Sequence, residues 1–251
     1  MKKLFIMPLL LLSLAFAFAQ RPAADKIETS KGTLNIQPLN HATLALTWQG
    51  KMIYTDPNGG AKTFQGVASP DLILITDIHG DHFNPETLKA INASKAILVV
   101  PQAVADKLPE DLKGKAVVLD NGETTSQLNF TIKAVPMYNL PETSDTRHPK
   151  GRGNGYVLTF GDKNIYISGD TSGIPEMRAL KDIAVAFVCM NLPYTMDISE
   201  AAQAVLDFKP EVVYPYHYRG QGGLSDTEGF KKMVNDKNKN IEVRLRDWYA
   251  E

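Results

Sequence analysis

Short apolar runs separated by polar and turn-forming residues recur along most of the chain. Runs such as residues 72–75 and 185–190 have the length and composition of buried strands. In residues 198–208, by contrast, the apolar positions recur on a helical period, and Ser199 is placed to cap a helix. The pattern therefore predicts strands and helices within one chain.

The order of these elements predicts the fold class. Strands are expected at residues 33–37, 43–48, 51–55, 72–75, 96–100, 116–119, 129–135, 155–160, 164–168, 185–190, 211–214 and 241–245, and helices at 85–91, 101–107, 176–181, 198–208 and 226–235. The early strands follow one another as hairpins, whereas the later strands alternate with helices. This mixture favours an α/β fold in which two sheets pack face to face with helices outside.

The amino terminus has the pattern of a secretory signal peptide. Met1 is followed by two lysines, residues 4–18 are almost entirely apolar, and Ala17 and Ala19 precede Gln20. As a membrane span the run is short against the roughly 20 residues required, and an uncleaved anchor is the alternative. The sequence predicts a signal peptide at 1–19, a loose leader at 20–30 and one domain at 31–251. We expect a periplasmic or secreted protein with no stable membrane anchor after cleavage.

Charge and cysteine content narrow the function classes. The 27 lysines and arginines nearly balance 28 aspartates and glutamates, and no basic stripe with interleaved aromatic residues is present. Binding to nucleic acid through a charged face is therefore not expected. The single cysteine, Cys189, excludes an intramolecular disulfide, and its apolar run predicts a buried structural thiol. A small-molecule partner fits this composition, and the sequence does not determine the oligomeric state.

One loop carries the side chains best suited to a divalent metal. The run Thr-Asp-Ile-His-Gly-Asp-His at residues 76–82 places Asp77, His79, Asp81 and His82 directly after a predicted buried strand. A strand end presents ligands with little loss of freedom on binding. The alternative is a polar strand-to-helix connection, in which Asn84 or Asp81 caps a helix that begins near Pro85.

Further ligand types follow other predicted strands or lie in the loops between them. Asp170 follows the strand at 164–168, His217 follows the strand at 211–214, and His148 lies in a basic loop before the strand at 155–160. Taken singly, a Gly-Asp-Thr turn or a lone histidine is a common structural feature. Together they supply the additional ligands that a tetrahedral or five-coordinate ion needs.

These residues resemble those of a metallo-β-lactamase-fold hydrolase, in the branch that contains ascorbate-phosphate lactonases and related uncharacterised hydrolases. The similarity runs in order through most of the chain. It comprises residues 40–44, 53–57, 76–82, 134–139, 148–156, 166–171, 194–197 and 215–218. The resemblance implies a four-layer αββα sandwich whose ligand loops gather at one edge of the sheets.

The resemblance also implies two neighbouring metal sites that share one carboxylate. The ligands implied for the first site are Asp77, His79 and His148, those for the second are Asp81, His82 and His217, and Asp170 lies between the ions. The family loop normally reads Thr-His-x-His-x-Asp-His, so Asp77 stands here in place of the first histidine. The second set is intact, whereas the first has exchanged an imidazole for a carboxylate.

This exchange changes the chemistry expected of the centre. Three ionised carboxylates facing two dications leave a less positive centre, which acidifies a bound water less. A carboxylate also moves the preference from zinc towards manganese or iron. One or two divalent ions are therefore expected, with zinc first and manganese or iron as alternatives. A two-metal site of altered character, a single ion at the second site and a decayed site all remain open.

The ligands predict a hydrolase in which a metal-bound hydroxide attacks an ester, lactone, amide or phosphodiester. Asp81 would be both a ligand and the group that orients the hydroxide, so it is the predicted catalytic residue. The alternative is a non-catalytic or mononuclear ligand-binding protein on the same scaffold, with the first site degraded at Asp77. Metal content and metal-dependent turnover would separate the two functions.

Three residues are candidates for supporting roles. His41 is placed to hydrogen-bond a ligand carboxylate, or else to shape a turn. Tyr194 could offer its hydroxyl to a developing oxyanion, or else pack on its loop. Arg147, with Lys150 and Arg152, could attract a phosphate or carboxylate of a substrate, or else belong to a solvated basic loop.

Overall fold

Two seven-stranded β-sheets form the centre of the protein, here a computed structural model that describes residues 23–249. The strands of the first sheet are, in spatial order, β1 (Asp25–Thr29), β2 (Gly32–Asn40), β3 (Thr43–Trp48), β4 (Lys51–Thr55), β5 (Leu72–Leu74), β6 (Ile97–Val100) and β7 (Ala116–Val118). Strands β1 to β4 pair antiparallel, and β5 to β7 continue from β4 in parallel.

The second sheet repeats this plan. Its strands are β8 (Thr124–Gln127), β9 (Phe130–Met137), β10 (Gly153–Phe160), β11 (Lys163–Ile167), β12 (Ile183–Cys189), β13 (Val212–Tyr216) and β16 (Glu242–Val243). The first four pair antiparallel and the last three continue in parallel. A separate two-stranded ribbon consists of β14 (Arg219–Gly220) and β15 (Gly223–Leu224).

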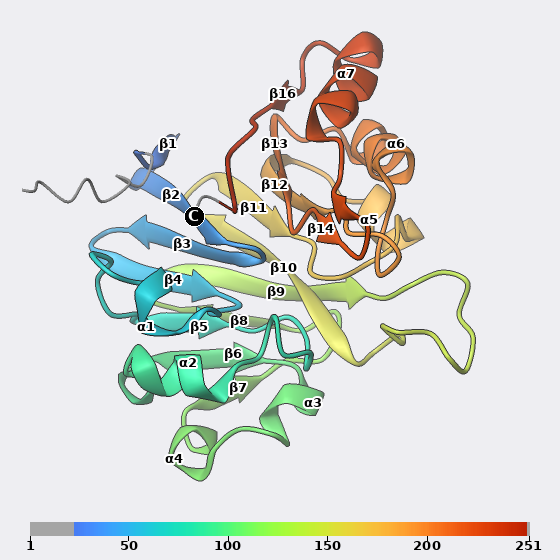
Figure 1. The fold of residues 1–251 in the computed structure, drawn as a ribbon. Helices are drawn as coiled ribbons and strands as arrows, with labels where there is room; N and C mark the ends of the chain where they lie inside the picture. Colours follow the sequence, from blue (N-terminus) through green and yellow to red (C-terminus); the bar gives the residue numbers. More distant parts are fainter. Residues whose placement is uncertain (1–22, 250–251) are drawn as a thin grey trace, which may run out of the picture.

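Helices cover the outer faces of both sheets, which gives the predicted four layers (Figure 1). Those of the first half are α1 (Gly60–Thr63), α2 (Pro85–Ala90), α3 (Gln102–Ala105) and α4 (Glu110–Lys113), with a 3₁₀ turn, η1 (Ala93–Lys95); those of the second half are α5 (Pro175–Arg178), α6 (Ile198–Phe208) and α7 (Thr227–Lys237). The predicted α/β sandwich is confirmed.

Alternation along the strands explains why the layers pack in this way. In β5, Leu72 and Leu74 belong to the core between the sheets, whereas Ile73 packs with the helices outside. Because successive side chains of a strand point to opposite faces, an uninterrupted apolar run buries both faces of this sheet. Strand β12 is buried along its whole length for the same reason.

Several elements differ from the sequence prediction. Strands β1 and β8 and helices α1 and α4 were not expected, and the second half also begins with hairpins. The loose leader predicted for 20–30 is wrong for Asp25–Thr29, which pair with β2. Asp197, not Ser199, caps α6, since its carboxylate accepts a hydrogen bond from Glu200 N at 2.7 Å.

The predicted signal peptide at 1–19 lies outside the described residues. Within residues 23–249, helices α6 and α7 are the longest at 11 residues each, and none is long and apolar enough to cross a bilayer.

Candidate metal centre

The loop after β5 presents its ligands from a structured turn. The backbone N–H groups of His82 and Phe83 both bond to the carbonyl of His79, at 3.0 and 2.8 Å. Asn84 then caps α2, because its side chain accepts from Thr87 N at 2.8 Å. The helix-cap alternative is therefore correct for Asn84, and it coexists with the ligand cluster just before it.

Two histidine nitrogens and one carboxylate, all buried and drawn from both halves of the chain, form a compact triangle of ligand groups. His82 Nε2 lies 3.1 Å from His217 Nε2, Asp170 Oδ2 lies 3.3 Å from His82 Nε2, and Asp170 Oδ1 lies 3.3 Å from His217 Nε2. A tetrahedral ion with bonds of about 2.0–2.1 Å sets its ligand atoms about 3.3–3.4 Å apart. The triangle therefore has the dimensions of one face of a metal coordination sphere.

Strand ends fix the two ligands of the second half. Asp170 follows β11 after Gly169, which has a φ of 61° and whose Cβ would lie 2.4 Å from Met137 Sδ. Only glycine fits there, because the left-handed backbone and the close methionine both exclude a side chain. His217 follows β13 with a φ of 47°, and its N–H donates to the carbonyl of His41 at 3.2 Å.

A buried carboxylate sets the tautomer of His82. Asp56 Oδ2 lies 2.8 Å from His82 Nδ1, and Asp56 also accepts from the backbone and hydroxyl of Thr76, at 2.8 and 2.6 Å. Since the ionised carboxylate is an acceptor, Nδ1 carries the proton and Nε2 keeps its lone pair. Such a carboxylate–histidine pair is the usual support of a metal-binding imidazole.

Asp81 stands at the open side of this triangle. Its Oδ2 lies 3.4 Å from His217 Nε2 and 3.3 Å from His41 Nε2, and 42% of its side chain is exposed. The ionised Asp81 carboxylate can only accept, so His41 Nε2–H donates to it, which is the contact that the sequence hypothesis for His41 described. In the neutral ring His41 Nδ1 then accepts from the Tyr249 hydroxyl at 2.8 Å, and that hydroxyl in turn accepts from Arg219 N at 3.0 Å.

The remaining histidines lie in a second group beside the first. Asp77 Oδ2 is 2.8 Å from His79 Nδ1 and 3.9 Å from His148 Nε2, and His148 Nε2 is 3.3 Å from Asp170 Oδ2. All seven predicted ligand residues thus meet at one edge of the sheets. Their spacing allows three overlapping groups, namely His41–Asp81–His217, Asp77–His79–His148 and His82–Asp170–His217.

Comparison with known proteins identifies the family and supports the fold. Residues 35–217 match the model of the beta-lactamase superfamily domain. The chain belongs to the beta-lactamase superfamily. A UPF0173 metal-dependent hydrolase from Pyrococcus abyssi is 33% identical over 191 residues, which cover 72% of this chain and 84% of the relative. Another from Thermococcus onnurineus is 31% identical over 213 residues, covering 81% and 93%.

Solved structures agree with this assignment. The crystal structure of a candidate metal-dependent hydrolase from Parabacteroides distasonis is 38% identical, with a TM-score of 0.79 and coverage of 89% of this chain and 97% of that one. Igni18, a metallo hydrolase from Ignicoccus hospitalis, shares the fold at 22% identity and a TM-score of 0.71, over 85% and 95% of the two chains. The protein is a metal-dependent hydrolase of the beta-lactamase superfamily, as the resemblance predicted.

The electrostatics of the hydrolase favour a cation within the triangle. Burial alone would raise the pKa of Asp170, but the charges of His217 and His82 hold it well below its usual range. Burial alone would lower the pKa of His82, but the Asp170 and Asp56 carboxylates raise it well above its usual value. The site therefore stabilises positive charge between these groups, and a divalent ion supplies that charge.

Orphaned polar atoms support the same conclusion. Among residues 23–249, the buried atoms His148 Nε2 and Asp170 Oδ1 make no hydrogen bond. Buried polar atoms without partners are costly and uncommon in folded proteins. Both atoms face the ligand cluster, so the hydrolase has the donor atoms that a metal ion would satisfy.

The three supporting candidates have different positions. His41 contacts Asp81, as described above. The Arg147 guanidinium stacks over the Tyr194 ring, 4.5 Å from its centre, and within the described chain the Tyr194 hydroxyl makes no hydrogen bond to the ligands. The packing alternative therefore describes Tyr194 better than an oxyanion contact does. The basic loop is not simply solvated, because Lys150 pairs with Glu176 at 3.0 Å.

Four contacts of the centre were not predicted from the sequence. They are those of Asp56, Asn139, Arg152 and Tyr249 with His82, His148, Asp77 and His41 respectively. Asp56 lies within a segment that carries the resemblance, and Arg152 lies in the basic loop, but neither position reveals its partner. Three of these contacts join segments far apart in the chain, and Asn139 and His148 lie nine residues apart in the loop between β9 and β10, so only the folded arrangement identifies the partners.

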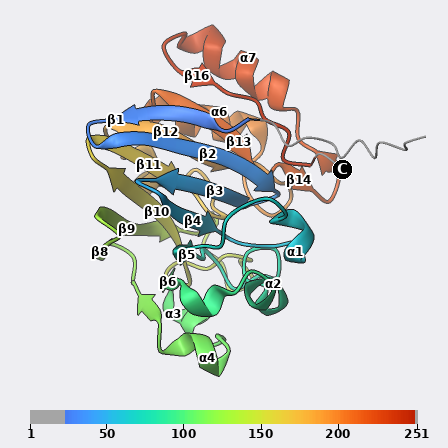
Figure 2. The same ribbon diagram turned by 90° about the vertical axis from the view of Figure 1, so that its left-hand side faces the viewer.

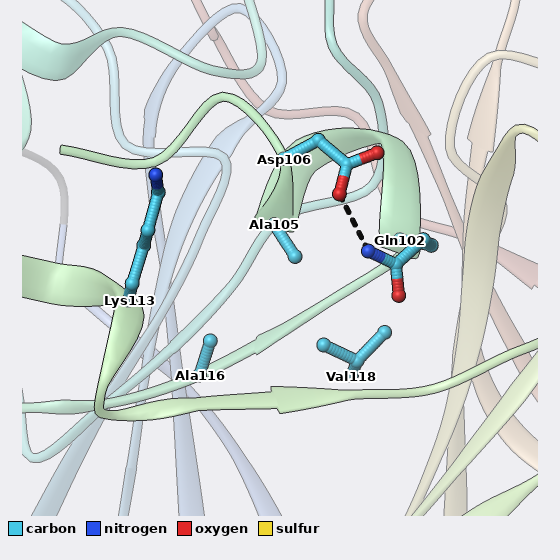
Figure 3. Close-up of a pocket in the computed structure, with 6 residues that line it drawn as sticks. All are labelled: Gln102, Ala105, Asp106, Lys113, Ala116 and Val118. Carbon is cyan, nitrogen blue, oxygen red and sulfur yellow. Dashed lines mark hydrogen bonds between the residues drawn. The ribbon is translucent and has the colours of Figure 1, made fainter. Parts of the chain in front are cut away.

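The pocket in Figure 3 lies apart from this chemistry. It is lined by residues of α3, α4 and β7, with Gln102 Nε2 donating to Asp106 Oδ1 at 2.6 Å. None of its lining residues belongs to the ligand cluster. We therefore assign the chemistry of the hydrolase to the ligand loops.

Proposed function

We propose that this hydrolase cleaves an ester, lactone, amide or phosphodiester bond of a small molecule at one divalent ion, zinc, held by the triangle of His82, Asp170 and His217. The distances of 3.1–3.3 Å that separate the two imidazole nitrogens and the Asp170 carboxylate carry this proposal. Three protein ligands and an open position are the usual arrangement of a catalytic zinc site.

The bound ion would supply a Lewis acid, which lowers the pKa of a water and polarises the oxygen of the scissile group. Three residues of the chain would determine the position of the ion. His82 and His217 would offer their Nε2 atoms to the ion, and Asp170 offers a buried carboxylate whose low pKa keeps it ionised at neutral pH. These three residues would hold the ion from the buried side, and Asp81 would lie at the remaining, open side.

Asp81 is the residue that would orient the attacking water and accept its proton. Burial alone would raise the pKa of Asp81, but hydrogen bonds from His217 and His41 lower it below its usual range. Its exposed fraction of 42% lets it reach a water at the mouth of the site. Hydrogen bonds from His41, backed by Tyr249, hold the carboxylate in one orientation, which is what general base catalysis requires.

We further propose that the hydrolase acts in the periplasm or is secreted. The basic start, apolar stretch and small-residue cleavage pattern of residues 1–19 support this location. A fusion of residues 1–30 to a reporter that is active only outside the cytoplasm tests the proposal. A reporter that stays inactive would contradict it.

Turnover of a substrate panel tests the reaction. The chain from residue 20, loaded with zinc, is assayed on a lactone, a carboxylic ester, an amide, a β-lactam and a phosphodiester. Asp81→Asn should lower kcat about 10²- to 10⁴-fold on the substrate that is cleaved, because it removes the proton acceptor. His217→Ala should abolish both zinc retention and turnover.

Asp71→Asn serves as the matched control. Asp71 pairs with Lys51 at 3.0 Å on the first sheet and contacts no ligand residue, so this variant should keep full turnover. Turnover that survives His217→Ala, or a chain that takes up no metal, would refute the proposed reaction.

A further inference from the structure

Both carboxylate oxygens of Asp77 are bound by an arginine. Arg152 Nε donates to Oδ1 at 3.1 Å and Arg152 Nη2 donates to Oδ2 at 3.0 Å. Asp77 is fully buried, and only 20% of the Arg152 side chain is exposed. A two-pronged pair of this kind is among the strongest and most directional side-chain interactions.

The same arginine engages His79. Arg152 Nη2 lies 3.4 Å from His79 Nε2, and His79 Nδ1 lies 2.8 Å from Asp77 Oδ2. A guanidinium has no acceptor, so His79 Nε2 must accept and Nδ1 must carry the proton that it donates to Asp77. Both ring nitrogens of His79 are therefore committed, and neither retains a lone pair for a metal.

Of the two histidines in the first group, only His148 keeps a free lone pair. Its Nδ1 lies 2.8 Å from the amide oxygen of Asn139, which can only accept, so in the neutral ring the proton is on Nδ1 and Nε2 keeps its lone pair. That nitrogen lies closer to Asp170, at 3.3 Å, than to Asp77, at 3.9 Å. Since a zinc site takes at least three protein ligands, the first group does not fit a second divalent ion.

The backbone fixes the arginine in this position. Asn154 N donates to Thr76 O at 2.9 Å and so ties the start of β10 to the residue before Asp77. This approach requires Gly153, because a Cβ there would lie 2.8 Å from Thr76 O. Arg152 and Asp77 thus flank a direct contact between the two sheets, and their pairing follows from the fold.

We propose that the Arg152 guanidinium takes the place of the first metal ion, so that the centre consists of one divalent ion and one fixed organic cation. The inference rests on the proposed function for the site at His82, Asp170 and His217. One dication and one guanidinium carry three positive charges, which balance the three carboxylates Asp77, Asp81 and Asp170. A centre with two dications and no guanidinium would carry one excess positive charge.

The pairing leaves one end of the guanidinium for a substrate. Because the fork to Asp77 uses Nε and Nη2, Nη1 makes no hydrogen bond within the described part of the chain. It is a permanently charged donor beside the proposed ion. The arginine would bind an anionic oxygen of the substrate, the task that a second metal performs in two-metal sites.

Metal stoichiometry tests this arrangement directly. The chain from residue 20 is stripped with chelator and titrated with Zn²⁺ and, separately, with Mn²⁺, followed by calorimetry and elemental analysis. We expect about one ion per chain, and an Mn²⁺ electron paramagnetic resonance spectrum without the coupling of a two-metal centre. The double variant Asp77→His/Arg152→Ala restores an imidazole and removes the guanidinium, so it should bind about two ions per chain.

Two further variants keep the test decisive. Arg152→Lys retains a cation, so it should still bind one ion. It provides a second readout if the double variant does not fold. Lys150→Ala removes a cation from the same loop, one that pairs with Glu176, and should also keep one ion. Circular dichroism confirms that each variant is folded.

The outcomes separate this inference from the proposed function. Two ions bound by the wild-type chain, or one ion bound by a folded double variant, would overturn the role of Arg152. A chain that binds one ion but cleaves nothing would refute the reaction and leave the stoichiometry intact. A chain that binds no ion would refute both.

Discussion

At the scale of single residues, Asp56 decides which nitrogen of His82 faces the ion. It is fully buried and accepts three hydrogen bonds, from Thr76 N, Thr76 Oγ1 and His82 Nδ1. Asp56→Asn should weaken zinc affinity about 10- to 100-fold, because the amide no longer fixes the tautomer of His82. Competition with a coloured chelator measures this change, and an affinity equal to wild type would show that Asp56 does not support the ligand.

Cys189 is predicted to be chemically silent in the folded protein. Burial and the nearby Asp170 charge raise the pKa of its thiol to about 11, so the thiol stays protonated at pH 8. A thiol reagent such as Ellman's should therefore label no cysteine in the native chain at pH 8 and one in denaturant. Labelling of the native chain at the denatured rate would contradict the buried position.

Individual residues also show what a sequence can predict. The seven ligand residues were recognisable because each follows or precedes a strand in a pattern that resembles the family. The pairing of Arg152 with Asp77 was not recognisable. These residues are 75 positions apart, and they meet only because the start of β10 contacts the end of β5 in the folded chain. In the sequence, the basic loop that contains Arg152 and the substituted ligand Asp77 are separate features. In the structure they form one ion pair.

At the scale of secondary structure, the close approach of the start of β10 to Thr76, just after β5, depends on the absence of a side chain at Gly153. A Cβ there would lie 2.8 Å from Thr76 O and 2.3 Å from Met137 Cε. Gly153→Ala should lower the free energy of unfolding by about 1–3 kcal/mol, the usual cost of overpacking. Urea unfolding measures the loss.

Gly114→Ala is the control for this substitution. Gly114 has an ordinary helical backbone, and nothing lies within 4 Å of the added Cβ. Its free energy of unfolding should stay within about 0.5 kcal/mol of wild type. Equal losses in the two variants would mean that the contact between β10 and Thr76 is not the cause.

Strand β1 is predicted to stabilise the fold. Its Asp25 carboxylate binds Arg246 Nε at 2.9 Å and the Tyr214 hydroxyl at 2.8 Å, and β1 lies beside the segment after β16 (Figure 2). A chain that starts at residue 31 should melt at a lower temperature than one that starts at residue 20, by roughly 2–4 °C for each kcal/mol lost. Asp25→Ala in the longer chain isolates the ion pair from the strand pairing, and equal melting temperatures of the two chains would contradict the prediction.

The unexpected strands share a physical cause. In β1 the only apolar side chain is that of Ile27, and β8 reads Thr-Thr-Ser-Gln, so neither carries the apolar run that identifies a strand. Both are edge strands, held by backbone pairing to a single neighbour. Central strands such as β5, β6 and β12 were predicted correctly because strands buried on both faces consist of continuous apolar runs.

At the scale of the whole molecule, the metal site should couple binding to stability. Zinc at 100 times its dissociation constant should stabilise the folded chain by about 2.7 kcal/mol, since the unfolded chain lacks the site. This corresponds to a rise in melting temperature of roughly 5–11 °C for a chain of this size. Differential scanning calorimetry with and without chelator measures the rise, which His217→Ala should abolish.

The two halves of the chain have the same plan, and each contributes half of the site. Four antiparallel strands are followed by three parallel ones in each sheet. The first half supplies Asp81 and His82, and the second supplies Asp170 and His217. Neither half alone offers the three protein ligands that an ion requires.

This division sets the moment at which the ion can enter. His217 lies 135 residues after His82, so the site is completed only when the strands of the second half have been made and both sheets have docked. The ion is therefore taken from the surroundings in which folding finishes. If the proposed export takes the chain across the membrane unfolded, the metals outside the cytoplasm, and not those at the ribosome, would decide which element the mature protein binds.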